Sequence, residues 1–173
     1  MSNRYMLTLM GEDRPSIVAR VTQILYETGC NLGEASMMRL GTSFSMMLLI
    51  DAVEDAKQLQ QTLQTVADEL GLILHIDSAQ SIDHGHQVPD VCITVHGADR
   101  AGIVAQVTSA SAEAGLNIID LASDVGGTTD APLYVLHIEG VATQGVEALE
   151  KVLMPLQTEG IKVDVRAIDT LIG

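Results

Sequence analysis

The chain has 173 residues, and a composition of 47% hydrophobic and 18% charged residues is too apolar for a disordered protein. Aromatic residues make up only 2%, and 9 Lys and Arg stand against 23 Asp and Glu, for a formal net charge of −14. Nucleic acids and anionic membranes are bound by clustered cations, and single strands also by stacking aromatics, so this composition argues against direct binding of either. The acidic surface either docks a basic protein partner or serves solubility alone.

The two cysteines, Cys30 and Cys92, lie far apart in the sequence and form no CxxC pair. Each has apolar neighbours, so we expect buried free thiols in a reducing compartment. The first residues lack the pattern of a signal peptide, and the longest apolar run, 46–50, is too short to cross a bilayer. We therefore expect a cytoplasmic protein without a membrane segment.

The sequence contains an internal repeat, in which segment 5–36 returns as segment 91–122. The matches concentrate around one loop and the start of the helix after it, and they are not confined to apolar positions. The identical pairs are Thr8/Thr94, Gly11/Gly97, Asp13/Asp99, Arg14/Arg100, Ile17/Ile103, Val18/Val104, Ala19/Ala105, Val21/Val107, Thr22/Thr108, Glu27/Glu113, Gly29/Gly115 and Asn31/Asn117. We expect a first module at 1–80, a polar linker at 81–90 and a second module at 91–173.

The spacing of apolar residues predicts the same order of elements in both copies. A short strand (5–10; 91–96) precedes a helix that begins near residue 17 or 103 and ends at Gly29 or Gly115. Two strands (31–40 and 43–51; 117–125 and 133–139), a second helix (56–70; 146–156) and a last strand (72–79; 161–168) follow. Residues 128–132 predict a turn longer by two residues in the second copy, and Pro155 is expected to kink or shorten the last helix.

This βαββαβ order predicts the fold class. With right-handed crossovers it gives an α+β, ferredoxin-like module, in which both helices lie on one face of a four-stranded antiparallel sheet. A single module leaves a sheet edge or the other sheet face uncovered. Pairing of the two copies, or of two chains in a homodimer, is therefore expected.

The candidate site is the loop between the first strand and the first helix of each copy. A helix start presents unpaired N–H groups that hold a carboxylate or phosphate, and Gly102 lets a ligand approach the backbone. Asp13 and Asp99 are candidates for helix N-caps as well as for the site. Arg14 and Arg100 lie where the helix dipole disfavours a cation, so each either pairs with the adjacent Asp or receives an anion.

Asn31 and Asn117 follow the glycine that ends the first helix of each copy. An amide offers a donor and an acceptor, which suits the ammonium and carboxylate of an amino acid, but asparagine is equally common in turns. We interpret His84 and His86 as part of a solvated linker rather than a metal site, and the methionines at 37, 38, 46 and 47 as packing. The sequence contains no recognisable catalytic arrangement, so we expect no enzyme activity, cofactor or metal.

The repeated pattern G-x-D-R-[PA]-[SG]-I-V-A-x-V…E-x-G-x-N-[LI] resembles that of the ACT domain, a small amino-acid-binding regulatory module with the βαββαβ fold. Two such modules that fill nearly the whole chain are similar to the glycine cleavage system transcriptional repressor family. The resemblance implies a ligand site at a module interface, between the first loop and the second strand. It maps onto Asp13, Arg14, Ser16, Ile17 and Asn31, and onto Asp99, Arg100, Gly102, Ile103 and Asn117.

Each copy departs once from the Pro-Gly of the family pattern, with Ser16 in the first loop and Ala101 in the second. Ser16 adds a side chain where the ligand approaches, so the second loop is the better candidate. The repressor family implies a regulator that responds to glycine by binding a transcription activator, without touching DNA; we expect glycine first and serine next as ligands. The alternatives are a detached ACT pair that regulates a metabolic enzyme in trans, and a small enzyme or purely structural dimer.

Overall fold

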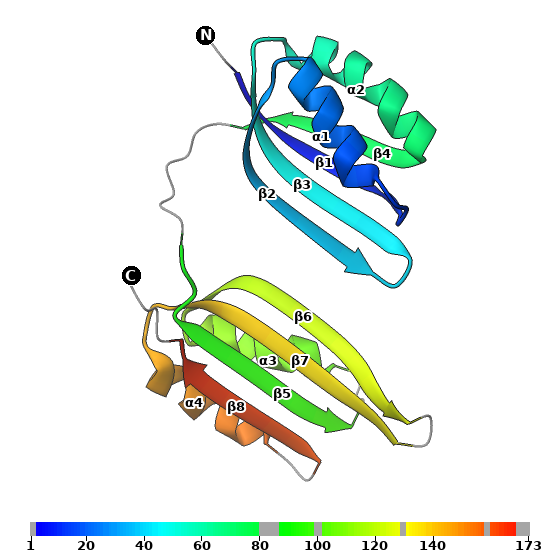
Figure 1. The fold of residues 1–173 in the computed structure, drawn as a ribbon. Coiled ribbons are helices and arrows are strands. Elements are labelled where there is room, and N and C mark those ends of the chain that lie inside the picture. The colour runs from blue at the N-terminus through cyan, green and yellow to red at the C-terminus, as the bar shows by residue number, and fades with distance from the viewer. Residues whose placement is uncertain (1–2, 80–86, 99–101, 129–130, 158–159, 169–173) are drawn as a thin grey trace. The chain divides into compact units, whose positions relative to one another are not determined.

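The computed structural model describes residues 3–79, 87–98, 102–128, 131–157 and 160–168. Each half of the chain forms one βαββαβ unit (Figure 1). The chain divides into Met1–Asp83 and His84–Gly173. The elements of the first unit are β1 (Asn3–Glu12), α1 (Ile17–Glu27), β2 (Asn31–Leu40), β3 (Ser43–Ala52), α2 (Ala56–Leu70) and β4 (Leu72–Ser78). Those of the second are β5 (Val91–Ala98), α3 (Ile103–Glu113), β6 (Leu116–Thr128), β7 (Ala131–Ala142), α4 (Val146–Leu153), a 3₁₀ turn (Met154–Leu156) and β8 (Ile161–Ala167).

Both sheets have the predicted topology. The strand order is β2-β3-β1-β4 in the first unit and β6-β7-β5-β8 in the second, and all neighbours are antiparallel. In each unit the two helices cover one face of the sheet, and we call the other face the open face (Figure 1). The predicted α+β, ferredoxin-like fold class is thus confirmed.

Local chemistry explains where the helices end. Gly29 and Gly115 follow the C-caps of α1 and α3 with φ of 72° and 76°, the left-handed conformation that glycine adopts at low cost. Helix α2 begins at Asp55, whose carboxylate accepts from the Gln58 amide at 2.9 Å in a capping box. Helix α4 has only 8 residues and passes into the 3₁₀ turn that contains Pro155, so the expected shortening is confirmed.

The core of each unit is aliphatic and lies between the sheet and its helices. Alternate residues of β1 and β3 point into the first core, and alternate residues of β5 and β7 into the second. The largest fully buried side chains are Leu7, Ile17, Leu25, Ile50 and Leu59 in the first core and Ile93, Leu136, Ile138, Leu149 and Leu153 in the second.

Two expectations, the longer turn of the second copy and the buried cysteines, are wrong. The loop between β6 and β7 is not longer than its counterpart, because Thr128 and Ala131 are register partners as Leu40 and Ser43 are. The additional residues extend the strands, which tolerate Pro132 near the first residue of β7. Both cysteines are only partly buried.

The expectation that the methionines serve packing is wrong for three of the four. Met46 is buried, whereas Met37, Met38 and Met47 are exposed, since β2 is an edge strand exposed along its whole length and Met47 faces the open side. Among the residues described, every helix falls short of the length and apolar character needed to cross a membrane.

Candidate functional site

The loop between β1 and α1 is held against the β2–β3 hairpin. The Asp13 amide donates to the Thr42 carbonyl at 2.8 Å, and the Asp13 carboxylate lies 3.2 Å from Arg39 Nε. Asp13 is therefore not the N-cap of α1, which is Ser16. Its counterpart Asp99 lies outside the described residues.

Arg14 pairs with an acid, but not with the adjacent Asp13. Its Nη2 lies 3.0 Å from Glu12 Oε2, and both side chains are more than half exposed. A Cβ added at Gly71 would lie 3.9 Å from the same Nη2, which places the guanidinium beside the C-terminal end of α2, where the helix dipole favours a cation. Exposed ion pairs contribute little, so the guanidinium stays accessible to an anion. Arg100 lies outside the described residues.

The starts of α1 and α3 share an unusual backbone. Their N-caps, Ser16 and Gly102, have φ of 71° and 86°. Ser16 is the one non-glycine residue with positive φ in the described part of the chain, and its hydroxyl makes no capping hydrogen bond. Both helix starts therefore present first-turn N–H groups that no N-cap side chain satisfies, which is the arrangement that binds a carboxylate.

The isoleucines that open the two helices belong to the core. Ile17 is 2% exposed and Ile103 is 5% exposed. The side chains of Ile17 and Ile103 are therefore not available to a ligand, and only their backbone N–H groups are.

The predicted asparagines lie at the other end of each unit from the loop. Asn31 is the register partner of Asp51, whereas the loop leaves β1 at Glu12, which pairs with Ser43. Helix α1, with 11 residues and a length of about 16 Å, separates the two ends. Asn117 occupies the corresponding place in the second unit, where its Nδ2 donates to Gln87 Oε1 at 2.8 Å. A single unit therefore does not bring loop and asparagine to one small ligand.

A charged pair lies beside Asn31. Arg4 Nε and Nη2 donate to the two oxygens of Asp51 at 2.9 and 3.2 Å. This hydrogen-bonded guanidinium lowers the pKa of the Asp51 carboxyl below its ordinary value, and the same contact raises the pKa of Arg4.

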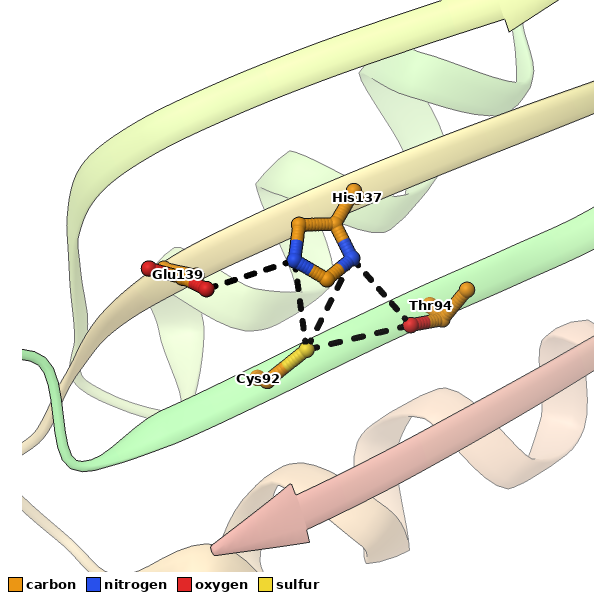
Figure 2. A network of polar contacts seen from close by, with 4 residues as sticks. All are labelled: Cys92, Thr94, His137 and Glu139. Atoms are coloured by element: carbon orange, nitrogen blue, oxygen red, sulfur yellow. Dashed lines mark hydrogen bonds and ion pairs between the residues drawn. The ribbon is translucent and has the colours of Figure 1, made fainter. Parts of the chain in front are cut away.

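Sequence reasoning missed a polar network on the open face of the second sheet, which joins Cys92 and Thr94 of β5 to His137 and Glu139 of β7 (Figure 2). The signal was present as alternating polar residues in two predicted strands. Their pairing depends on strand register, which the sequence alone did not provide.

Comparison with known proteins identifies the family of the two units. The sequence pattern of the ACT domain matches residues 4–77 and 90–166. The glycine cleavage system transcriptional repressor of Escherichia coli K12 is 26% identical over 158 residues, which cover 88% of this chain and 83% of the repressor.

Two solved structures share the fold over 97% of this chain. A protein from Galdieria sulphuraria is 23% identical, with a TM-score of 0.76 and 99% of that chain covered. A putative glycine cleavage system transcriptional repressor is 16% identical, with a TM-score of 0.69 and 98% covered. With the sequence pattern matching both units, the chain belongs to the ACT domain family and contains two copies of the domain in tandem.

Proposed function

We propose that this protein is an amino-acid-responsive regulator that controls transcription of the glycine cleavage system through a protein partner, without binding DNA itself. The observation that carries the ligand part is the uncapped, left-handed start of α3 at Gly102. The regulatory part is supported by the similarity to a glycine cleavage system transcriptional repressor, which extends over both ACT domains.

The chemistry of the second unit suits a small amino acid, glycine first and serine next. The first-turn N–H groups of α3 receive the carboxylate, and Gly102 leaves space because nothing described lies within 4 Å of a Cβ added there. Asn117 Nδ2 donates to Gln87, which leaves Asn117 Oδ1 as an acceptor for the ammonium group. We propose that Asp99 and Arg100 form a polar rim around the carboxylate of the ligand. Asp13 and Arg14 are proposed to do the same at the first loop.

The separation of loop and asparagine favours a site completed by a second module. When two edge strands of this kind pair in antiparallel fashion, the start of one strand lies beside the end of the other. The start of β6 carries Asn117, and its end lies at the sheet end from which α3 departs. The edge is also apolar and exposed at Ile118, Ile119, Leu121 and Val125, so we expect a homodimer with ligand sites across the paired edges.

The partner is a protein rather than a nucleic acid. The net charge of −14 repels phosphate backbones and complements a basic surface. The open face of the first unit also exposes an apolar patch at Met10, Met38, Leu40, Met47 and Ile73, and most of these residues line a depression of about 550 Å³. We propose that a transcription activator docks on this patch.

Calorimetric titration with glycine and serine tests the site. We expect Asn117→Ala to weaken binding by about 1–3 kcal/mol while leaving the fold intact, because a polar partner of the ligand is lost. Gly102→Val is expected to block the ligand, and Asn31→Ala, the matched control in the first unit, to matter less. Wild-type affinity in both Asn117→Ala and Gly102→Val contradicts this site, and no binding of any amino acid contradicts the ligand response.

A reporter fused to a glycine cleavage promoter tests the regulatory part. Loss of the chain is expected to abolish the response of the reporter to glycine, and the purified chain is expected not to retard duplex DNA in a gel. A chain that binds glycine but leaves the reporter unchanged instead favours regulation of a metabolic enzyme in trans.

A further inference from the structure

We propose that the open face of the second unit binds a divalent transition-metal ion, Zn²⁺ in the first place, through Cys92, His137 and Glu139. No sequence pattern assigns a metal to these residues, and the ion would lie on the sheet rather than at the start of α3. The proposal is independent of the amino-acid site.

Strand register brings the three side chains together. Cys92 pairs with Glu139 across β5 and β7, and Thr94 pairs with His137. The residues that alternate with them, among them Ile93 and Ile138, are buried in the core under the helices. Cys92, His137 and Glu139 therefore project from the open face, as Figure 2 shows.

The distances between the candidate ligand atoms fit a tetrahedral ion. Cys92 Sγ lies 3.6 Å from His137 Nε2, and His137 Nε2 lies 3.3 Å from Glu139 Oε1. One ligand atom from each residue lies within 4.8 Å of the other two. With Zn–S of about 2.3 Å and Zn–N and Zn–O of about 2.0–2.1 Å, tetrahedral geometry requires about 3.5 Å between S and N and about 3.3 Å between N and O. The side chains thus need little movement to accept the ion.

Thr94 orients the imidazole for this role. Its hydroxyl lies 3.4 Å from His137 Nδ1. Cys92 Sγ lies almost equally far from the two ring nitrogens, 3.6 Å from Nε2 and 3.7 Å from Nδ1, whereas Glu139 contacts Nε2 alone (Figure 2). A proton on Nδ1 donated to the Thr94 oxygen leaves the lone pair on Nε2, the nitrogen beside Glu139. Such outer contacts are the usual support of a metal-ligating histidine.

The first unit shows that the fold does not need these polar groups. The equivalent register pairs there are Met6 with Leu49 and Thr8 with Met47. The second unit retains the threonine and carries sulfur, nitrogen and oxygen ligands in place of three apolar side chains. The polar set is thus not a requirement of the ACT sheet.

The donor set selects the class of metal. Mg²⁺ and Ca²⁺ prefer ligand shells of oxygen alone, whereas one thiolate, one imidazole and one carboxylate suit Zn²⁺. On binding, the Cys92 thiol releases its proton to solvent and the thiolate coordinates the ion. The side chains of His137 and Glu139 are 43% and 36% exposed, so a fourth position opens to solvent for water or another small ligand.

Titration of the full chain with Zn²⁺ against a chromophoric chelator tests the proposal, with Co²⁺ as a spectroscopic probe. We expect one high-affinity site, a thiolate-to-cobalt charge-transfer band, and a rise of the unfolding midpoint with Zn²⁺. Cys92→Ser and His137→Ala are expected to lose all three. Thr94→Val is expected to weaken binding by about 10-fold, at the lower end of the usual cost of an outer-shell partner.

The chain offers matched controls. Cys30→Ser removes the other thiol, and His75→Ala removes a histidine that also faces a carboxylate, Asp77 at 3.0 Å. The double variant His84→Ala and His86→Ala removes the linker pair. All three are expected to bind Zn²⁺ as the wild type does. Wild-type affinity no higher than that of Cys92→Ser, or loss of binding in the linker variant alone, would overturn the proposal.

Discussion

Replacing Ser16 by glycine is expected to stabilise the first unit. The Ser16 backbone has a φ of 71°, in the left-handed region that costs a residue with a Cβ about 1–2 kcal/mol. Glycine removes this cost but loses more conformational freedom on folding, which takes back about 0.5–1 kcal/mol. Since the Ser16 hydroxyl makes no capping bond, we expect a net gain of about 0.5–1 kcal/mol.

Amide hydrogen exchange measures this gain unit by unit, because each unit has its own core. Exchange of the most protected amides of the first unit should slow by about 2- to 5-fold in Ser16→Gly, while the second unit serves as the reference in the same sample.

Gly102→Ser is the matched control, because its φ is 86° and nothing described lies within 4 Å of its added Cβ. It should speed exchange of the second unit by a similar factor. Unchanged or faster exchange in Ser16→Gly, together with a neutral Gly102→Ser, would refute the reasoning that this backbone carries strain.

Three further perturbations follow from single contacts. Arg4→Ala should return the lowered pKa of Asp51 toward its ordinary value, as carbon-detected NMR titration measures. In the wild type the ion pair adds stability that is fully present above the pKa of Asp51 in the unfolded chain. This stability is lost as the pH falls through the lower pKa of Asp51 in the folded protein. Asp55→Ala should cost about 0.5–2 kcal/mol in urea unfolding, since the capping box of α2 is lost, whereas Asp55→Asn should retain most of it. Gly140→Ala should cost about 1–3 kcal/mol in the same assay, because its Cβ would clash with the Asn117 carbonyl oxygen; wild-type stability in that variant would contradict the close pairing of β6 with β7.

The fold could be predicted from the sequence because local signals agree in both copies. The glycines that end α1 and α3 recur at equivalent positions. In both copies the spacing of apolar residues is helical before this glycine and alternates in the strands that follow it. The β6–β7 hairpin was mispredicted because Gly, Thr and Pro are typical of turns, yet here they continue the antiparallel pairing. Pro132 is tolerated because it lies beyond the last register pair of β5 with β7, Ala98 with Leu133.

The candidate site was harder to predict for reasons of distance. Sequence repetition indicated that the helix starts and the asparagines matter together, but it does not show that α1 holds them at opposite ends of a unit. The partner of Asp13 is Arg39 on another strand, and the contact of Cys92 with His137 spans 45 residues. Such pairs depend on strand register, which is a property of the folded sheet.

Hydrogen exchange with and without saturating glycine tests the central claim most directly. If the protein is an amino-acid-responsive regulator with its site at the second loop, glycine should slow exchange at the first-turn amides of α3, after Gly102, and at the start of β6 around Asn117. The equivalent amides after Ser16 should change less. Glycine that leaves exchange unchanged at both places in the second unit would contradict the account.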